Sequence, residues 1–181
     1  PGFRTNLAAQ KGITAMNLLN SFSFELPTKI EYGVGAAAGL ADIIKALNAE
    51  SILVVTDKGI GNSGLLEPIS NLLDADNIAW KVFDNVEPNP KDYNVQAGTE
   101  IVRRLGADCL LAVGGGSPID VAKGIAMLLT NGGSYADYQW GGNTITQRSA
   151  PLIAIPTTAG TGSEVSKVAV IVDPENPFKK G

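Results

Sequence analysis

Short apolar runs alternate with helix-length segments along most of this 181-residue chain. Three of the runs, 51–57, 79–83 and 109–113, are mainly apolar and have the length of strands, and 51–57 and 109–113 favour buried strands. The segments 65–73 and 91–105 between them favour helices long enough to cross from one parallel strand to the next. We therefore predict an α/β fold in which a doubly wound, mainly parallel sheet carries helices on both faces.

The remaining segments extend this pattern toward both ends of the chain. Residues 1–15 show neither periodicity, and we expect a leader or loose arm there, followed by one domain over 16–181. The other expected elements are an extended run over 29–32, a glycine-bearing turn over 59–64, helices over 36–47 and 118–129, and strands over 152–155 and 168–172.

Charge and hydropathy exclude two classes of partner. The 14 Lys and Arg residues against 18 Asp and Glu give a formal net charge of −4, with no basic stripe to neutralise nucleic-acid phosphates. No apolar run approaches the roughly 18 residues that cross a bilayer. We therefore expect a cytoplasmic protein that binds neither nucleic acid nor membrane.

The chain contains no histidine. It therefore lacks the side chain that ordinarily titrates near neutral pH, which is also the commonest protein ligand of metals such as zinc. Its single cysteine, Cys109, lies in an apolar run, where a buried and unreactive thiol is the expected state. Acid–base or metal chemistry must come from other residue types.

Three glycines, Gly114 to Gly116, follow a predicted strand, and Ser117 and Pro118 then suit the N-cap and first position of a helix. A helix N-terminus at the carboxyl end of a strand offers unpaired N–H groups and about half a positive charge, and glycines let a bulky anion approach. The stretch predicts a phosphate-binding loop, with a tight turn that binds nothing as the alternative. Asp120 and Lys123 are expected to pair on the helix surface.

A second loop of small residues, 156–164, follows the strand expected over 152–155. Its threonines and serine supply many hydroxyl and backbone donors, which suit a polar ligand without strong charge. The alternative is a flexible hydroxyl-rich loop with no ligand.

Asp57 ends the strand expected over 51–57, at the same sheet edge as the three glycines. A carboxylate there can accept hydrogen bonds from both ribose hydroxyls of an adenosine and repels a 2′-phosphate, which favours NAD over NADP. The alternative role of Asp57 is a helix cap. Asn89, between two prolines, is expected to be a helix cap first and a ligand contact second.

Five segments together resemble the iron-containing (group III) alcohol dehydrogenases. The two main segments are GGGSPIDVAK over 114–123 and PTTAGTGSEV over 156–165. The supporting segments are IEYGVG over 30–35, VTDK over 55–58 and EPNP over 87–90. Their order and spacing agree with that family, and the resemblance covers the chain from Phe22 to its end.

The resemblance implies a Rossmann-like N-terminal coenzyme domain paired with a C-terminal helical domain that holds the metal. Gly115, Gly116 and Ser117 would bind the diphosphate, and Asp57 the adenosine ribose. Asp120 would lie near the nicotinamide or hold the loop. The other implied coenzyme contacts, along the groove and at the domain junction, are Asn89, Thr157, Thr158, Thr161, Val170 and Lys179.

In that family one Asp and three His hold the metal, at positions that would follow Gly181. The resemblance therefore implies that iron assists the full-length enzyme but is not bound by this chain, whose metal domain would be absent. We expect the coenzyme-binding portion of an NAD-dependent alcohol dehydrogenase that acts on a small alcohol or aldehyde, a primary alcohol or diol on the alcohol side. We also expect the chain to be inactive alone and the enzyme to be a homodimer or larger.

Two alternatives stay open beside this reading. One is a relative of the zinc-dependent glycerol dehydrogenases, which usually carry Lys at the position of Ser117. The other is a nucleotide-binding module without catalytic function.

Overall fold

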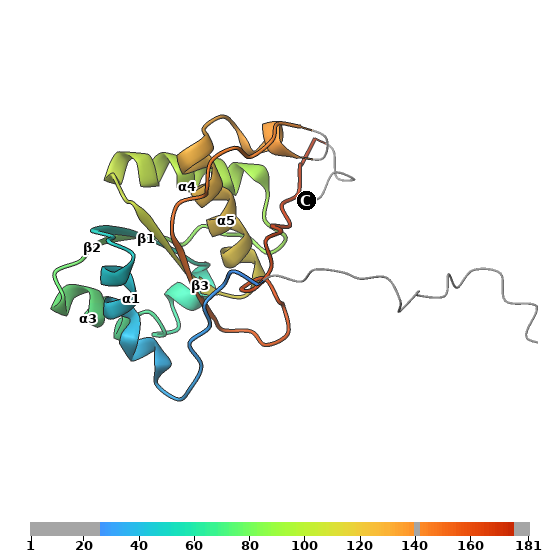
Figure 1. Ribbon diagram of the computed structural model, residues 1–181. Coiled ribbons are helices and arrows are strands. Elements are labelled where there is room, and N and C mark those ends of the chain that lie inside the picture. The colour runs from blue at the N-terminus through green and yellow to red at the C-terminus, as the bar shows by residue number, and fades with distance from the viewer. Residues whose placement is uncertain (1–25, 140–141, 176–181) are drawn as a thin grey trace, which may run out of the picture.

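A four-stranded parallel sheet forms the centre of the structure, a computed structural model that describes residues 26–139 and 142–175. The strands are β1 (Ser51–Val55), β2 (Ala79–Phe83), β3 (Cys109–Gly114) and β4 (Leu152–Pro156). They lie in the order β2-β1-β3-β4, and each neighbouring pair is parallel. Helices cover both faces of this sheet (Figure 1), so the predicted doubly wound, Rossmann-like α/β fold is confirmed.

The helices form two layers because side chains alternate across each strand. The α-helices are α1 (Leu40–Ala46), α2 (Lys58–Gly61), α3 (Glu67–Ala75), α4 (Asp92–Leu105) and α5 (Gly116–Asn131). Leu53 and Val55 of β1 share one core with α4 and α5. Ile52 and Val54 of the same strand share the other core with α1 and α3. A strand buried on both faces has to be apolar along its whole length, which explains its continuous apolar run.

Glycines let α4 and α5 approach each other closely. A Cβ added at Gly98 of α4 would lie 2.3 Å from Cδ1 of Ile125 in α5. A Cβ added at Gly124 of α5 would lie 2.9 Å from Cγ1 of Val95 in α4. Carbon atoms in ordinary contact are about 3.5–4.0 Å apart, so a larger residue at either position would push the helices apart. This packing fixes α5 against α4.

Several short elements differ from the predictions. The helix expected over 36–47 begins with a 3-10 turn, η1 (Ala36–Gly39), and becomes α-helical only after Gly39. The glycine-bearing turn expected over 59–64 starts inside α2. The run expected over 29–32 belongs to no strand, and the aromatic segment after α5 forms a second 3-10 turn, η2 (Tyr135–Tyr138).

The prediction of a strand over 168–172 is wrong. A single bridge joins Val172 to Lys91 at the start of α4, and the segment forms no ladder with the sheet. Side chains of Asp120 and Lys123 bond its backbone groups instead. Because those groups find partners on α5, the segment does not need strand pairing.

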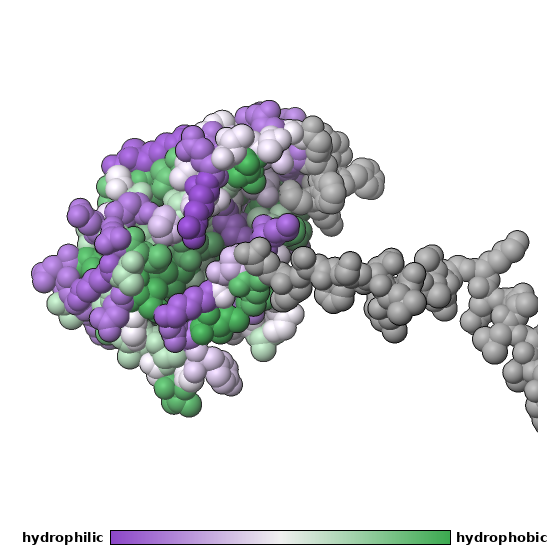
Figure 2. All heavy atoms as spheres, in the orientation of Figure 1, coloured by the Kyte–Doolittle hydropathy of each residue, from purple (hydrophilic) through white to green (hydrophobic). Residues whose placement is uncertain are grey.

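The leader or arm expected over 1–15 lies outside the described residues. In the two described stretches of the chain, none of the helices combines the length and the apolar character needed to span a membrane. Figure 2 shows hydrophilic side chains over much of one face, with hydrophobic ones between them.

Candidate functional site

The chain changes direction across the sheet between β1 and β3. From β1 it continues to β2 on one side, and it later returns to add β3 and β4 on the other side. At such a switch point the loops after the two central strands diverge, and open α/β sheets bind ligands in the crevice between them. A buried hydrogen bond of 2.7 Å from Thr56 Oγ1 to the carbonyl of Val113 joins the two strand ends. The candidate site lies at this edge of the sheet.

The first turn of α5 is open at this edge. Gly115 occupies the N-cap position with extended backbone, and no side chain caps the helix there. The prediction that Ser117 is the N-cap is therefore wrong, because the helix begins earlier and Ser117 and Pro118 both lie in its first turn. The N–H groups of a first turn have no partner inside their helix, and the helix dipole adds partial positive charge. This end of α5 is suited to an anion.

The two small-residue loops lie side by side at the start of α5. The N–H of Thr157 donates a hydrogen bond of 2.9 Å to the carbonyl at the end of β3. A Cβ added at Gly115 would lie 3.2 Å from Thr158 Oγ1, and one added at Gly116 would lie 3.7 Å from Cβ of Thr161. The structure thus brings the three predicted threonines together with the predicted glycines.

A cavity of about 810 Å³ lies beside the first turn of α5. Its volume falls in the range that small-molecule ligands occupy, about 300–1,000 Å³. Asp57 from the loop after β1 and Ser117 from α5 both line it. Tyr93 of α4 and two residues after β2, Asp84 and Asn85, line it as well. Two of the predicted site residues therefore face one shared space.

Asp57 caps the short helix α2. Its Oδ1 accepts a hydrogen bond of 2.9 Å from the N–H of Ile60, so the alternative of a helix cap is confirmed. The same side chain lines the larger cavity, so capping does not remove the carboxylate from the candidate site. The ribose role of Asp57 stays a prediction.

A smaller cavity of about 190 Å³ shares Ser117 with the larger one. Asn89, Gly116, Asp120 and Val170 line it as well. The first turn of α5 thus borders both spaces, and a single elongated ligand bound across that turn can reach both.

The prediction that Asn89 caps a helix is wrong. α4 begins later, and its N-cap is Lys91, whose N–H donates a hydrogen bond of 2.9 Å to Oδ1 of Asn94. Asn89 instead has left-handed backbone, with φ of 51°, a conformation that Asn tolerates better than most residues. Its place is the wall of the smaller cavity.

Asp120 is buried and fully engaged with protein groups. Its Oδ1 lies 3.2 Å from Nζ of Lys123, and its Oδ2 accepts a hydrogen bond of 3.0 Å from the N–H of Val170. The expected pair with Lys123 is therefore present, but it is largely buried and does not lie on the helix surface. Burial, with the charge of Asp120 adding to it, raises the pKa of Tyr135 to about 12. Asp120 thus holds a loop, and its contact with a ligand stays a prediction.

Sequence reasoning does not identify Asp84 and Asn85 as site residues. They directly follow β2, and the pairing of Val55 with Phe83 brings them beside the end of β1. A broader rule, which marks any polar side chain directly after a parallel strand, would have included these two residues as well as Asp57. Lys179, the last predicted contact, lies outside the described residues.

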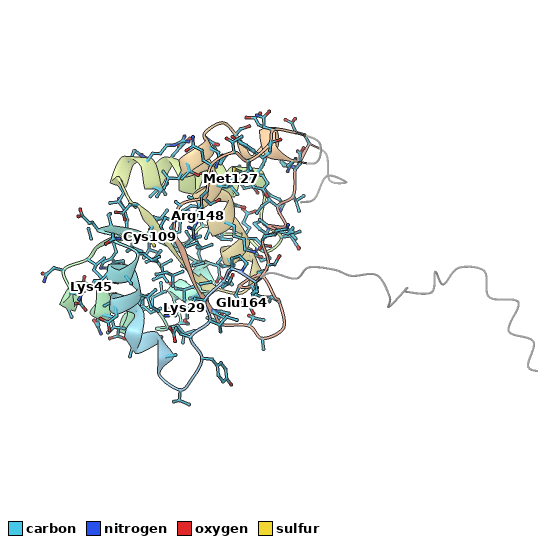
Figure 3. All side chains as sticks on the ribbon, viewed as in Figure 1. Lys29, Lys45, Cys109, Met127, Arg148 and Glu164 are labelled. Atoms are coloured by element: carbon cyan, nitrogen blue, oxygen red, sulfur yellow. The ribbon has the colours of Figure 1, made fainter. Side chains whose placement is uncertain are left out.

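Cys109 lies inside the molecule, where Figure 3 labels it, as the sequence predicts. Burial raises the pKa of its thiol to about 12, and the nearby charge of Asp108 acts in the same direction. A protonated thiol is a poor nucleophile, so Cys109 is unsuited to catalysis. Within residues 26–139 and 142–175, no three or more His, Cys, Asp or Glu side chains are grouped so that they could hold a metal ion.

Sequence comparisons connect this chain with one enzyme family. A family model described as iron-containing alcohol dehydrogenase matches residues 27–181. Choline dehydrogenase of Bacillus subtilis (strain 168) is 42% identical over 159 residues, which cover 87% of this chain and 40% of that protein. Lactaldehyde reductase of Escherichia coli (strain K12) is 38% identical over 150 residues, which cover 82% of this chain and 39% of that protein.

Solved structures give the same result. The crystal structure of a 1,3-propanediol oxidoreductase matches with a TM-score of 0.83 and 36% identity, over 89% of this chain and 42% of that chain. Sulfoacetaldehyde reductase from Bifidobacterium kashiwanohense, in complex with NAD+, matches with a TM-score of 0.80 and 36% identity over the same shares. The chain therefore spans about 40% of the length of the relatives it matches.

Proposed function

This chain belongs to the iron-containing alcohol dehydrogenase family, and we propose that it binds NAD as the coenzyme-binding portion of an enzyme that transfers hydride between a primary alcohol or diol and nicotinamide. The observation that carries the proposal is the open first turn of α5 at the switch point, bordered by two cavities. A relative of similar structure solved with NAD+ supports it.

In this proposal the diphosphate binds at the first turn of α5, where Gly115, Gly116 and Ser117 offer backbone N–H groups. The adenosine half occupies the larger cavity, and the carboxylate of Asp57 accepts hydrogen bonds from its ribose. The nicotinamide half extends to the smaller cavity beside Asn89. The shared lining by Ser117 supports this division, because one extended molecule can then occupy both spaces.

The remaining proposed contacts lie around the nicotinamide half and follow the family resemblance. The packing of the threonine loop against Gly115 and Gly116 supports a place for it beside the diphosphate and the nicotinamide ribose. These contacts are Thr157, Thr158, Thr161, Val170 and Lys179.

The carboxylate of Asp57 also gives a reason for a preference for NAD over NADP. A 2′-phosphate would bring further negative charge into a cavity that Asp57, Asp84 and Glu87 already line. Lys58 is the only basic residue that lines this cavity within the described parts of the chain. The balance of charge thus favours an unphosphorylated ribose.

A divalent iron, when bound in this family, polarises the oxygen of the substrate. The described residues offer no group of ligands for it, so we assign to them only the binding and orientation of the coenzyme. We expect the 181-residue chain to bind NAD+ without oxidising alcohols. Turnover of an alcohol by this chain, with or without added Fe²⁺, would contradict that expectation.

The substitution Ser117→Glu tests the proposed coenzyme site. It places a carboxylate in the first turn of α5, where it competes for the positive end of the helix dipole and repels a diphosphate. Isothermal titration calorimetry with NAD+ should show affinity reduced by about 10-fold or more, which corresponds to about 1.4 kcal/mol. Thr144→Glu is the matched control, because it adds the same charge in an exposed loop away from the first turn of α5. That loop is bonded to the other end of α5, where the N–H of Thr146 donates to the side chain of Asn131.

Backbone amide shifts supply a second readout. On addition of NAD+, the amide signals of Gly115, Gly116 and Ser117 should shift in the wild-type chain and in Thr144→Glu. If NAD+ binds the wild-type chain without moving these signals, or binds Ser117→Glu as tightly as the control, the diphosphate does not lie on α5 and the proposal is wrong.

A further inference from the structure

The segment 168–172 is held on α5 by a buried ion pair. Oδ2 of Asp120 accepts a hydrogen bond of 3.0 Å from the N–H of Val170. Nζ of Lys123 donates a hydrogen bond of 2.8 Å to the carbonyl of Val168. Nζ of Lys123 also lies 3.2 Å from Oδ1 of Asp120. This contact orients both side chains for their hydrogen bonds to the segment.

Other contacts fix the same segment. The hydroxyl of Tyr135 donates to the carbonyl of Ala169 at 3.4 Å. The ring of Tyr135 sits over Gly124 of α5, where an added Cβ would lie 3.1 Å from Cε2. The N–H of Val172 donates a hydrogen bond of 2.8 Å to the carbonyl of Pro90. The path of 168–172 is therefore set by bonds at Val168, Ala169, Val170 and Val172.

This segment lines the smaller cavity but not the larger one. Val170 and Val172 line that cavity together with Ser117 and Asn89. None of the residues that line the larger cavity comes from 168–172. A shift of the segment would therefore change the shape of the smaller cavity and leave the larger one intact.

The charge of the pair also suits its place near the start of α5. The side chains of Asp120 and Lys123 are only 8% and 15% exposed. A buried ion pair contributes little net stability compared with apolar side chains, so stability alone gives a weak reason for this one. An unpaired carboxylate one turn into α5 would repel a diphosphate, whereas Asp120 with Lys123 adds no net charge there.

We propose that Asp120 and Lys123 are positioning residues, which hold the 168–172 segment so that Val170 and Val172 form the nicotinamide-side wall of the coenzyme site. This inference rests on the function proposed above. It assigns Asp120, which also lines the smaller cavity, an effect through the backbone of Val170.

The test compares two ligands in the 181-residue chain. NAD+ occupies both cavities in the proposed binding mode, whereas ADP occupies only the larger cavity and the first turn of α5. In a variant that carries both Asp120→Ala and Lys123→Met, and so leaves neither charge unpaired beside the diphosphate, the dissociation constant of NAD+ should rise by about 10-fold, the scale of one lost charge-assisted hydrogen bond, while that of ADP changes less than about 2-fold. Asp120→Asn keeps an oxygen that accepts from Val170 and should recover most of the NAD+ affinity.

Amide hydrogen exchange tests the holding role without any ligand. The amides of 168–172 should exchange about 10-fold faster in Asp120→Ala, while those of β1 keep their rates and show that the fold is intact. Asp76→Asn is the control, because it neutralises a carboxylate that pairs with Lys45 on the exposed α1–α3 side. It should change neither exchange in the segment nor the affinity for either ligand.

Each result decides the question. Unchanged exchange over 168–172 in Asp120→Ala overturns the holding role. Faster exchange with unchanged NAD+ affinity, or an equal loss of ADP affinity, overturns the role in the coenzyme site. Failure of the wild-type chain to bind NAD+ at all overturns the proposed function, and normal wild-type binding with unaffected variants overturns this inference alone.

Discussion

Asp57→Asn separates the two roles that one side chain has in this structure. Oδ1 of Asp57 caps α2 by accepting from the N–H of Ile60, and the carboxylate lines the larger cavity. Asn is as good an N-cap as Asp, so the substitution keeps the cap and removes only the charge. We expect it to leave stability nearly unchanged and to relax the discrimination against NADP+.

The size of the effect follows from Coulomb's law. A ribose that Asp57 bonds through its hydroxyls would place a 2′-phosphate about 5 Å from the carboxylate, where each unit of phosphate charge costs about 0.8 kcal/mol in water and about 3 kcal/mol at an effective dielectric constant of ~20. Removing this charge should raise the affinity for NADP+ relative to NAD+ by about 10- to 100-fold. Asp84 remains in the cavity, so Asp57→Asn with Asp84→Asn should shift the ratio further.

The assay is the ratio of dissociation constants for the two coenzymes, measured by calorimetry at low and at high salt. Asp57→Ala is the comparison variant, because it removes both charge and cap and should cost about 1 kcal/mol of stability in addition. The difference in the free energy of unfolding between Asp57→Asn and Asp57→Ala, measured in urea, then gives the contribution of the cap. An unchanged NADP+ to NAD+ ratio in Asp57→Asn, with both coenzymes still bound, would refute the ribose role of Asp57.

Two further predictions concern the core. Gly98→Ala should lower the free energy of unfolding by about 1–3 kcal/mol, measured in urea, because the new Cβ would lie 2.3 Å from Cδ1 of Ile125. Adding Ile125→Val, which removes Cδ1, should restore part of the lost stability. Gly61→Ala is the control and should be tolerated, because its Cβ would meet nothing closer than 3.8 Å. Cys109 should resist a thiol reagent in the folded chain at pH 8, because burial raises the pKa of its thiol to about 12. The stability that this raised pKa contributes should be fully present below the ordinary thiol pKa of 9.0 and should be lost as the pH rises toward 12. Rapid labelling of the folded chain, or a Gly98→Ala variant as stable as wild type, would contradict the packing described here.

The two central strands, β1 and β3, could be predicted because they are buried on both faces. The run 51–55 has no polar residue after Ser51, and only a strand covered by helices on both sides requires that pattern. The strand over Ala79–Phe83 was predicted with its observed bounds although it lies at the sheet edge. The helices predicted between the strands are long enough to connect parallel neighbours, so these local patterns were sufficient to predict the fold class.

The failed strand prediction concerns backbone groups that find partners in distant parts of the chain, whereas the two failed cap predictions concern where a helix begins. The run 168–172 looks like a strand because it is apolar, but its backbone bonds go to Asp120, Lys123 and Tyr135, which the local sequence cannot reveal. Asn89 looks like a cap, yet the N-cap is Lys91, whose N–H donates to the side chain of Asn94. The structure brings most of the residues that the sequence singles out to one edge of the sheet, and their contacts with a coenzyme stay predictions.

The start of α5 links coenzyme to folding. This helix packs against the sheet and α4 along most of its length, but Gly115 leaves its first N–H groups without a side-chain acceptor. An anion bound there completes the helix, and any ligand that binds only the folded state adds RT ln(1 + [L]/Kd) to stability, about 2.7 kcal/mol at 100 times Kd. In the proposed function the coenzyme therefore also stabilises the fold, and the melting temperature of the chain should rise with the concentration of free coenzyme.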